Sequence, residues 1–200
     1  VWLLKGFIDE IPREYEEAAL HDRLHATTVY VTHDQSEAMA MADTIAVMNH
    51  GVIEQLAPPQ EIYDRPASMY VAEFIGSPSM NFLPCVRDAA GRLLVGGAAL
   101  DLPPAPTDRG ELILGVRPEH VRLGAAEGPV PRARVYGVEY LGTTQIVALT
   151  LPDGTPIKAR TPASLAAHVG DAFGLHLAAD RLTLFAGSDG RALRWGTGLG

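Results

Sequence analysis

Hydrophobic and β-branched residues gather in a short run at residues 27–32, "TTVYVT", which stops at a histidine and an aspartate. The run lacks polar alternation, and this pattern predicts a strand covered on both faces, as in a parallel sheet. Asp34 is followed three positions later by Glu37, the spacing of a capping box, so we expect a helix over residues 36–43. Ligands bind beyond the carboxyl ends of strands in open α/β sheets, which makes His33 a candidate functional residue.

Four shorter elements are expected after this strand and helix. "TIAVM" and "VIEQL" flank the turn "NHG" and predict a β-hairpin over residues 44–56. Pro59 predicts the first turn of a short helix that runs to Tyr63. "SMYVAEFIG" predicts another short helix that stops at Gly76. Upstream, "REYEEAAL" predicts a helix over residues 13–20, because its acidic residues come early, where the helix dipole favours them.

The pattern changes after "SPSMNFLP". From there on, short apolar runs such as "ELILGV" and "TQIVALTL" alternate with glycine and proline turns. Many short strands at close spacing predict a small barrel or sandwich. We therefore expect a domain boundary within residues 77–83, an α+β fold overall, and independent folding of residues 77–194.

Composition narrows the class of protein. The chain has 200 residues, a net charge of -8 and a pI of about 5.3. This acidity argues against a nucleic-acid-binding surface, which needs a basic face. The only cysteine is Cys85, so no intramolecular disulfide can form. No apolar run approaches the roughly 20 residues that a membrane helix needs.

A single histidine is a weak signal, and His33 could simply close a turn or cap a helix. A neutral imidazole at a strand end could also hydrogen-bond a phosphate oxygen or an attacking water. A hydrolase that uses His33 and Asp34 is a third interpretation, but no serine elbow accompanies them. His21 and His25 could share a helix face, yet no third metal ligand is evident and a solvated face fits them better.

The context of His33 is more specific than the residue itself. The stretch "ATTVYVTHDQSEAMAMADTIAVMNHGVIEQLAPPQEIYDRPASMYVAEFIGSPSMNFL" closely resembles the end of the ATPase subunit of ABC importers for sugars and glycerol phosphate. The resemblance implies that residues 20–76 are the truncated end of an α/β P-loop ATPase domain. "THD" would then be the switch loop, in which His33 contacts the γ-phosphate of ATP and helps to position the hydrolytic water. ATP and magnesium are the cofactors of the intact family.

Residues 77–200 resemble the C-terminal regulatory domain of the same family, an all-β OB-like barrel of the TOBE or MOP type. The similarity is carried by "GVRPEHVRL", "VEYLGTTQIVAL" and "AADRLTLF". Arg117, Pro118 and Glu119 would form its "RPE" turn, although a surface turn with an exposed ion pair of little energetic value explains them equally well. "Oligonucleotide-binding" names a fold here and implies no nucleic-acid ligand.

The first 19 residues fit a different protein class. "WLLKGFIDEIPREYEEAAL" resembles the cytoplasmic loop of the matching membrane permease, whose "EAA" helix docks on the ATPase. The resemblance makes Glu17, Ala18 and Ala19 partner-docking residues, whereas an ordinary acidic helix is the alternative. We interpret residues 1–19 as a permease-like arm joined near Leu20 to the ATPase-like part, and we expect few long-range contacts from this arm.

The sequence contains no "GxxxxGK[ST]" phosphate loop, no strand ending in a metal-binding aspartate, and no "LSGGQ"-like signature. We therefore expect that this chain alone neither binds ATP tightly nor hydrolyses it, and that it holds no magnesium. The resemblance implies permease subunits and a second ATPase subunit as partners, in the cytoplasm at the inner face of the membrane, and residues 27–32 could mediate self-association. The alternative is a stand-alone regulatory module that binds a small ligand or a protein without ATPase activity.

Overall fold

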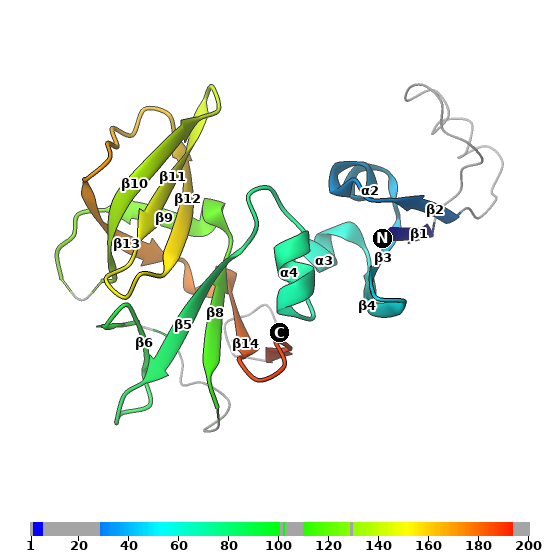
Figure 1. Ribbon diagram of the computed structural model, residues 1–200, viewed down its shortest axis with the longest axis horizontal. Coiled ribbons are helices and arrows are strands. Elements are labelled where there is room, and N and C mark those ends of the chain that lie inside the picture. The colour runs from blue at the N-terminus through cyan, green and yellow to red at the C-terminus, as the bar shows by residue number, and fades with distance from the viewer. Residues whose placement is uncertain (1, 6–28, 101, 103–109, 129, 194–200) are drawn as a thin grey trace. The chain divides into compact units, whose positions relative to one another are not determined.

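The structure is a computed structural model, and it describes the chain except for residues 1, 6–28, 101, 103–109, 129 and 194–200 (Figure 1). The chain divides into two compact units, Val1–Gly76 and Ser77–Gly200. Each unit has its own sheets and its own apolar core. Within the described residues, no helix is long and apolar enough to cross a membrane.

The described residues of the first unit form a four-stranded sheet with strand order β2-β1-β3-β4 and three short helices. Strand β1 is antiparallel to both β2 and β3, so β2 and β3 run parallel to each other with helix α2 between them in sequence. The elements of this unit are β1 (Trp2–Lys5), β2 (Val29–Thr32), α2 (Gln35–Met41), β3 (Thr44–Asn49), β4 (Val52–Ala57), α3 (Pro59–Asp64) and α4 (Met69–Phe74).

Local sequence signals explain most of these elements. Asp34 caps α2, Pro59 occupies the first turn of α3, and the Ser68 hydroxyl accepts a hydrogen bond from the Val71 amide at the start of α4. His50 and Gly51 both have positive φ and form the β3–β4 turn, as a tight hairpin requires. The helices and one face of the sheet enclose a small core of Ala38, Ile45, Val47, Ala57, Ile62, Val71 and Ile75.

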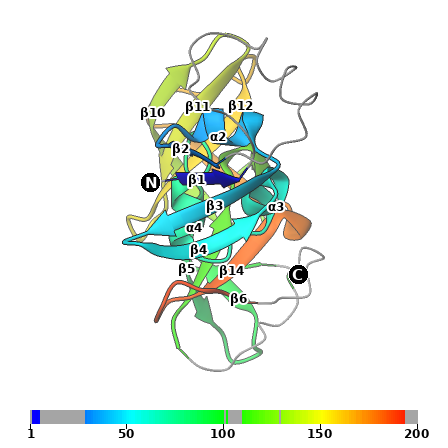
Figure 2. The same cartoon turned by 90° about the vertical axis from the view of Figure 1, so that its right-hand side faces the viewer.

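Two expectations about this sheet are wrong. Strand β2 is not a buried strand with parallel neighbours: it is an edge strand that pairs antiparallel with β1, and Val29 and Val31 are 53% and 54% exposed. The expectation of few long-range contacts from residues 1–19 is wrong for residues 2–5, because β1 lies inside the sheet (Figure 2). Residues 6–19 lie outside the described part of the chain. Strands β2 and β3 leave one strand position between them, and their inward-facing amide and carbonyl groups need a partner there. The extended backbone of residues 2–5 supplies it.

The described residues of the second unit, called the barrel below, form two antiparallel sheets and two short 3₁₀ turns. The strand orders are β12-β11-β10-β13-β9 and β15-β14-β8-β5-β6-β7. The elements are β5 (Asn81–Arg87), β6 (Leu93–Val95), β7 (Ala98–Ala99), β8 (Leu112–Val116), η1 (Pro118–His120), β9 (Val121–Gly124), β10 (Arg132–Tyr140), β11 (Thr144–Thr150), β12 (Pro156–Pro162), β13 (Ala172–Leu177), η2 (Ala179–Arg181), β14 (Leu182–Ala186) and β15 (Ala192–Leu193).

Alternating apolar residues from both sheets fill the core of this unit. Val135 and Leu149 come from the five-stranded sheet, and Leu114 and Leu184 come from the six-stranded sheet. Close packing has a local requirement at Gly115, where a Cβ atom would lie 2.6 Å from both Met80 and Phe185. The expected α+β fold with an all-β C-terminal part is confirmed.

One buried polar side chain joins the two sheets of the second unit. Asn81, 7% exposed at the start of β5, donates from Nδ2 to the carbonyls of Lys158 (2.9 Å) and Val116 (3.1 Å). Its Oδ1 accepts a hydrogen bond of 2.7 Å from the Lys158 amide. Strand β5 is thereby fixed to β12 of the opposite sheet, and the polar atoms of Asn81 are satisfied despite their burial.

Candidate functional site: the His33 turn

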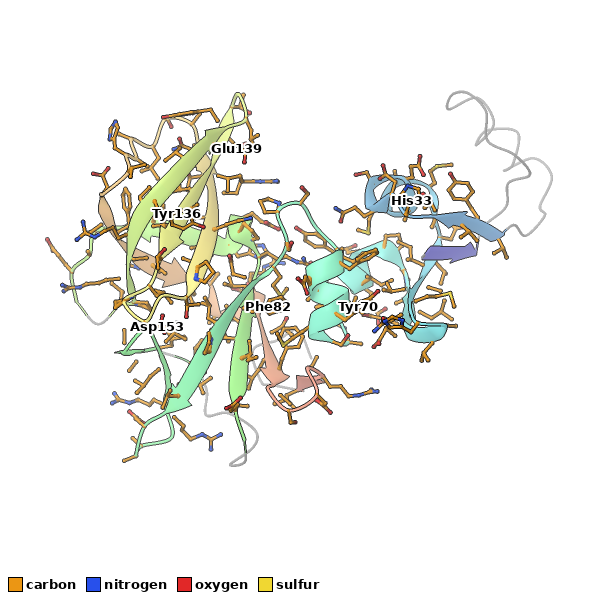
Figure 3. The ribbon with its side chains drawn as sticks, viewed as in Figure 1. His33, Tyr70, Phe82, Tyr136, Glu139 and Asp153 are labelled. Carbon is orange, nitrogen blue, oxygen red and sulfur yellow. The ribbon has the colours of Figure 1, made fainter. Side chains whose placement is uncertain are left out.

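His33 is the residue between the end of β2 and the N-cap of α2 (Figure 3). Its side chain is exposed, whereas the preceding Thr32 is buried. A buried strand residue followed at once by an exposed imidazole and a helix cap gives His33 a fixed backbone and a solvent-facing ring. This geometry matches what the strand–His–Asp–helix pattern predicts.

Hydrogen bonds hold the backbone around His33. The Asp34 amide donates to Thr32 Oγ1 (3.0 Å), and the Thr32 hydroxyl donates to Glu37 Oε2 (2.7 Å). Asp34 Oδ1 accepts from the amides of Ser36 (2.7 Å) and Glu37 (3.2 Å), as an N-cap does. Residues on both sides of His33 are thus tied to the first turn of α2.

Glu37 differs from its expected part in a capping box. Its carboxylate accepts from the hydroxyls of Thr32 and Tyr30 (3.2 Å), so it faces the strand. Desolvation and then the negative charge of Glu37 raise the pKa of the Tyr30 hydroxyl. Tyr30 therefore stays neutral and continues to donate at physiological pH. Glu37 fastens the last residues of β2 to α2.

This arrangement can present an imidazole to a ligand, but it does not resemble a complete hydrolytic site. Asp34 accepts hydrogen bonds at Oδ1 from two amides of α2, so this carboxylate acts as the helix cap. Among the described residues, no three His, Cys, Asp or Glu side chains are grouped so that they could hold a metal ion. The hydrolase interpretation thus gains no support from the geometry.

Gln35 was not anticipated as part of this site. Its Oε1 accepts a hydrogen bond of 2.7 Å from the Gly76 amide, 41 positions further along the chain. Such a contact leaves no mark in local sequence, because a glutamine at the first position of a helix is ordinary. The His33 turn is therefore linked to the last residue of the first unit.

The other predicted turn lies in the second unit. Pro118 and Glu119 belong to the 3₁₀ turn η1, which the Arg117 carbonyl closes by accepting from the His120 amide (2.9 Å). Arg117 itself is 2% exposed. The alternative of a surface turn with an exposed ion pair is therefore wrong for Arg117, whose guanidinium is enclosed by the barrel, and η1 packs against β12.

The remaining predicted residues lie outside the described part of the chain. These are the candidate docking residues Glu17, Ala18 and Ala19, together with His21 and His25. The helix expected over residues 13–20 lies there as well.

Comparison with known proteins identifies both halves of the second unit. The family model of the MalK OB fold domain matches residues 76–121, and that of the TOBE domain matches residues 114–185. Among solved structures, the cytoplasmic molybdate-binding protein ModG is similar with a TM-score of 0.41 and 18% identity, over 52% of this chain and 94% of that one.

Curated relatives match across both units. The sn-glycerol-3-phosphate import ATP-binding protein UgpC of Cereibacter sphaeroides is 46% identical over 174 residues, covering 87% of this chain and 49% of the relative. An uncharacterized ABC transporter ATP-binding protein, y4oS of Sinorhizobium fredii, is 52% identical over 68% of this chain and 37% of its own length. UgpC of Chromobacterium violaceum is 49% identical over 64% of this chain and 36% of its own. The chain spans half or less of the length of these relatives, and it corresponds to the C-terminal part of an ABC transporter ATP-binding protein.

Proposed function

We propose that this polypeptide supplies the switch histidine and the regulatory domain of an ATP-binding subunit that drives import of glycerol phosphate or a sugar. His33 would contact the γ-phosphate of ATP and orient the hydrolytic water. The observation that carries the proposal is the exposed imidazole on a turn fixed by Thr32, Asp34 and Glu37, within a sequence 46% identical to UgpC.

The remaining parts of the reaction lie beyond these residues. Phosphoryl transfer needs a phosphate-binding loop with its lysine and a magnesium ligand, and this sequence contains neither. The proposed cofactors are therefore ATP and magnesium in the intact subunit. The proposed partners are the permease subunits and a second ATP-binding subunit, at the cytoplasmic face of the membrane. Glu17, Ala18 and Ala19 are proposed as residues that dock between permease and ATPase.

A chimera tests this function. Residues 24–193 replace the matching part of the Cereibacter sphaeroides UgpC, and ATP hydrolysis is measured with purified protein. We expect hydrolysis in the chimera, and we expect His33→Ala to reduce kcat by about 100-fold or more, because positioning of the nucleophile and charge stabilisation dominate phosphoryl transfer. His50→Ala is the matched control, since His50 is also an exposed histidine of the first unit.

Equal activity of the His33→Ala and His50→Ala chimeras would contradict the role of His33. The second candidate function, a regulatory module without ATPase activity, rests on the independent core of the second unit. It predicts that residues 77–200 expressed alone fold and bind a regulatory ligand or protein, whatever the chimera does.

A further inference from the structure

A hydrogen bond from the His33 turn holds Gly76, the last residue of the first unit. The chain passes from the first unit to the second between Gly76 and Ser77. The Gly76 amide donates to Gln35 Oε1 over 2.7 Å in a partly buried position. Gly76 has a φ of 102°, a conformation that side chains other than glycine rarely adopt, so the direction of this amide depends on glycine.

Gln35 is close to His33 in the same rigid turn. It is the first residue of α2, directly after the N-cap Asp34 and two positions after His33. Asp34 binds the amides of Ser36 and Glu37, so the first turn of α2 and the backbone of His33 move together. A displacement of the Gln35 side chain is therefore transmitted to His33 through one capped turn.

The other side of the junction is held within the second unit. The Ser77 carbonyl accepts a hydrogen bond of 2.5 Å from Nη2 of Arg160 on β12. Arg160 is two positions from Lys158, whose backbone is fixed by Asn81. The Gly76–Ser77 peptide thus has an anchor in each unit, Gln35 before it and Arg160 after it.

We propose that Gln35 is a positioning residue for His33, and that it makes the orientation of the imidazole depend on the backbone at the Gly76–Ser77 junction. A rotation about Gly76 that turned its amide away from Gln35 would release the side chain and loosen the first turn of α2. The consequence for ATP hydrolysis rests on the proposed function of His33. The coupling itself is measured without nucleotide, so its failure would leave that function standing.

The first test follows the Gly76 amide by hydrogen exchange in the ¹⁵N-labelled 200-residue chain. Gln35→Ala is expected to speed exchange of this amide by about threefold to tenfold, the range for loss of one partly buried hydrogen bond. Gln35→Glu keeps an acceptor oxygen and should restore slow exchange. Gln55→Ala is the matched control: Gln55 also bonds to the backbone, at Arg65 and Ala67, but has no link to Gly76. Unchanged Gly76 exchange in Gln35→Ala would overturn the proposal.

The second test changes Arg160, the anchor on the other side of the Gly76–Ser77 peptide, and follows the effect at His33. Arg160→Ala is expected to shift the Gly76 amide and His33 imidazole resonances, whereas Lys158→Ala removes the same charge from the same strand and should leave both in place. Circular dichroism verifies that the barrel stays folded in both variants. The proposal fails if the two variants perturb the His33 resonances equally, or if neither perturbs them. A His33 shift in Arg160→Ala that disappears when Gln35→Ala is added would support it.

Discussion

The two units differ in how many apolar residues they bury. The core of the second unit contains eighteen buried hydrophobic residues drawn from two facing sheets, among the residues described. The corresponding cluster of the first unit contains seven buried residues among those described, on one face of a single sheet. Its strands leave Val31, Val52 and Leu56 more than half exposed. Stability follows buried apolar area, so the second unit should be the more stable of the two.

The two units also differ in net charge, and this difference again favours the stability of the second unit. Residues 1–76 contain four basic and thirteen acidic residues, whereas residues 77–200 contain twelve and eleven. The first unit thus has a net charge of -9 and the second a net charge of +1, which together give the -8 of the chain. Excess like charge opposes compaction, which adds to the effect of a small core. The larger core and the balanced charge of the second unit are features of an independently folding domain, and four experiments test this difference between the units.

The largest effect is expected from removing β1. Deletion of residues 1–5 leaves the inward-facing backbone groups of β2 and β3 without partners, so the sheet of the first unit should lose its amide protection as a whole. The barrel should change its Tm by no more than about 2 °C, because it shares no core with that sheet. Hydrogen exchange measured by mass spectrometry reports on both units. Retained protection of β3 would show that β1 contributes little.

A matched pair of core truncations compares the units directly. Leu149→Ala in β11 should lower the free energy of unfolding of the barrel by about 2–5 kcal/mol, and Ile62→Ala in α3 should lower that of the first unit similarly. Both residues are fully buried. Denaturant unfolding, followed by amide signals from each unit, should show each variant moving only its own transition. A single shared transition that moves in both variants would mean that the units unfold as one.

The link between the two sheets of the barrel should have a smaller effect. Asn81→Ala leaves the partly buried amide of Lys158 and its carbonyl without their side-chain partner, at a cost of about 1–3 kcal/mol. Asn49→Ala is the control, because Asn49 donates to Glu54 within the β3–β4 hairpin of the first unit. Urea unfolding of the barrel should respond to the first variant and not to the second. An unaltered barrel midpoint in Asn81→Ala would show that apolar packing alone fixes the sheets.

The smallest effect concerns Cys85 of the barrel. Burial raises the pKa of its thiol from 9.0 to about 12. The unfolded chain loses this proton first, so Cys85 lowers the stability of the barrel as pH rises from 9 towards 12 and has no influence below pH 9. Iodoacetamide should therefore modify Cys85 slowly at pH 8. A Cys85→Ala, Val86→Cys variant moves the thiol to an exposed neighbouring position and should react faster. Equal rates would contradict the burial of Cys85.

Sequence signals predicted the elements whose causes are local. The β3–β4 hairpin follows from the "NHG" turn, the start of α2 from Asp34, and the start of α3 from Pro59. The barrel strands follow from short apolar runs between glycine and proline turns, as along β8 and β11. The prediction that β2 is covered on both faces, as in a parallel sheet, is wrong, because the exposure of a strand depends on which segments pair with it. That choice is made by distant residues, here those of β1.

The same distinction between local and distant causes applies to the candidate site. His33 could be found from its position after a strand and from the resemblance of its surroundings. Gln35 and Asn81 could not, because each bonds with a residue far along the chain, Gly76 and Lys158 respectively. An amide side chain gives no periodic pattern from which such a partner could be inferred. The enclosure of Arg117 was missed for a related reason, since a charged residue beside a proline turn is usually exposed.

The hydrogen bonds of Asn81 determine which substitutions the barrel tolerates at positions 81 and 158. All three of its hydrogen bonds end on backbone atoms, those of Val116 and Lys158. The side chain at position 158 can therefore vary in size and charge without loss of these three hydrogen bonds. Position 81, in contrast, needs a side chain of the same length with both a donor and an acceptor. In a saturation mutagenesis library selected for folded protein, position 81 should accept almost nothing and position 158 almost anything except proline.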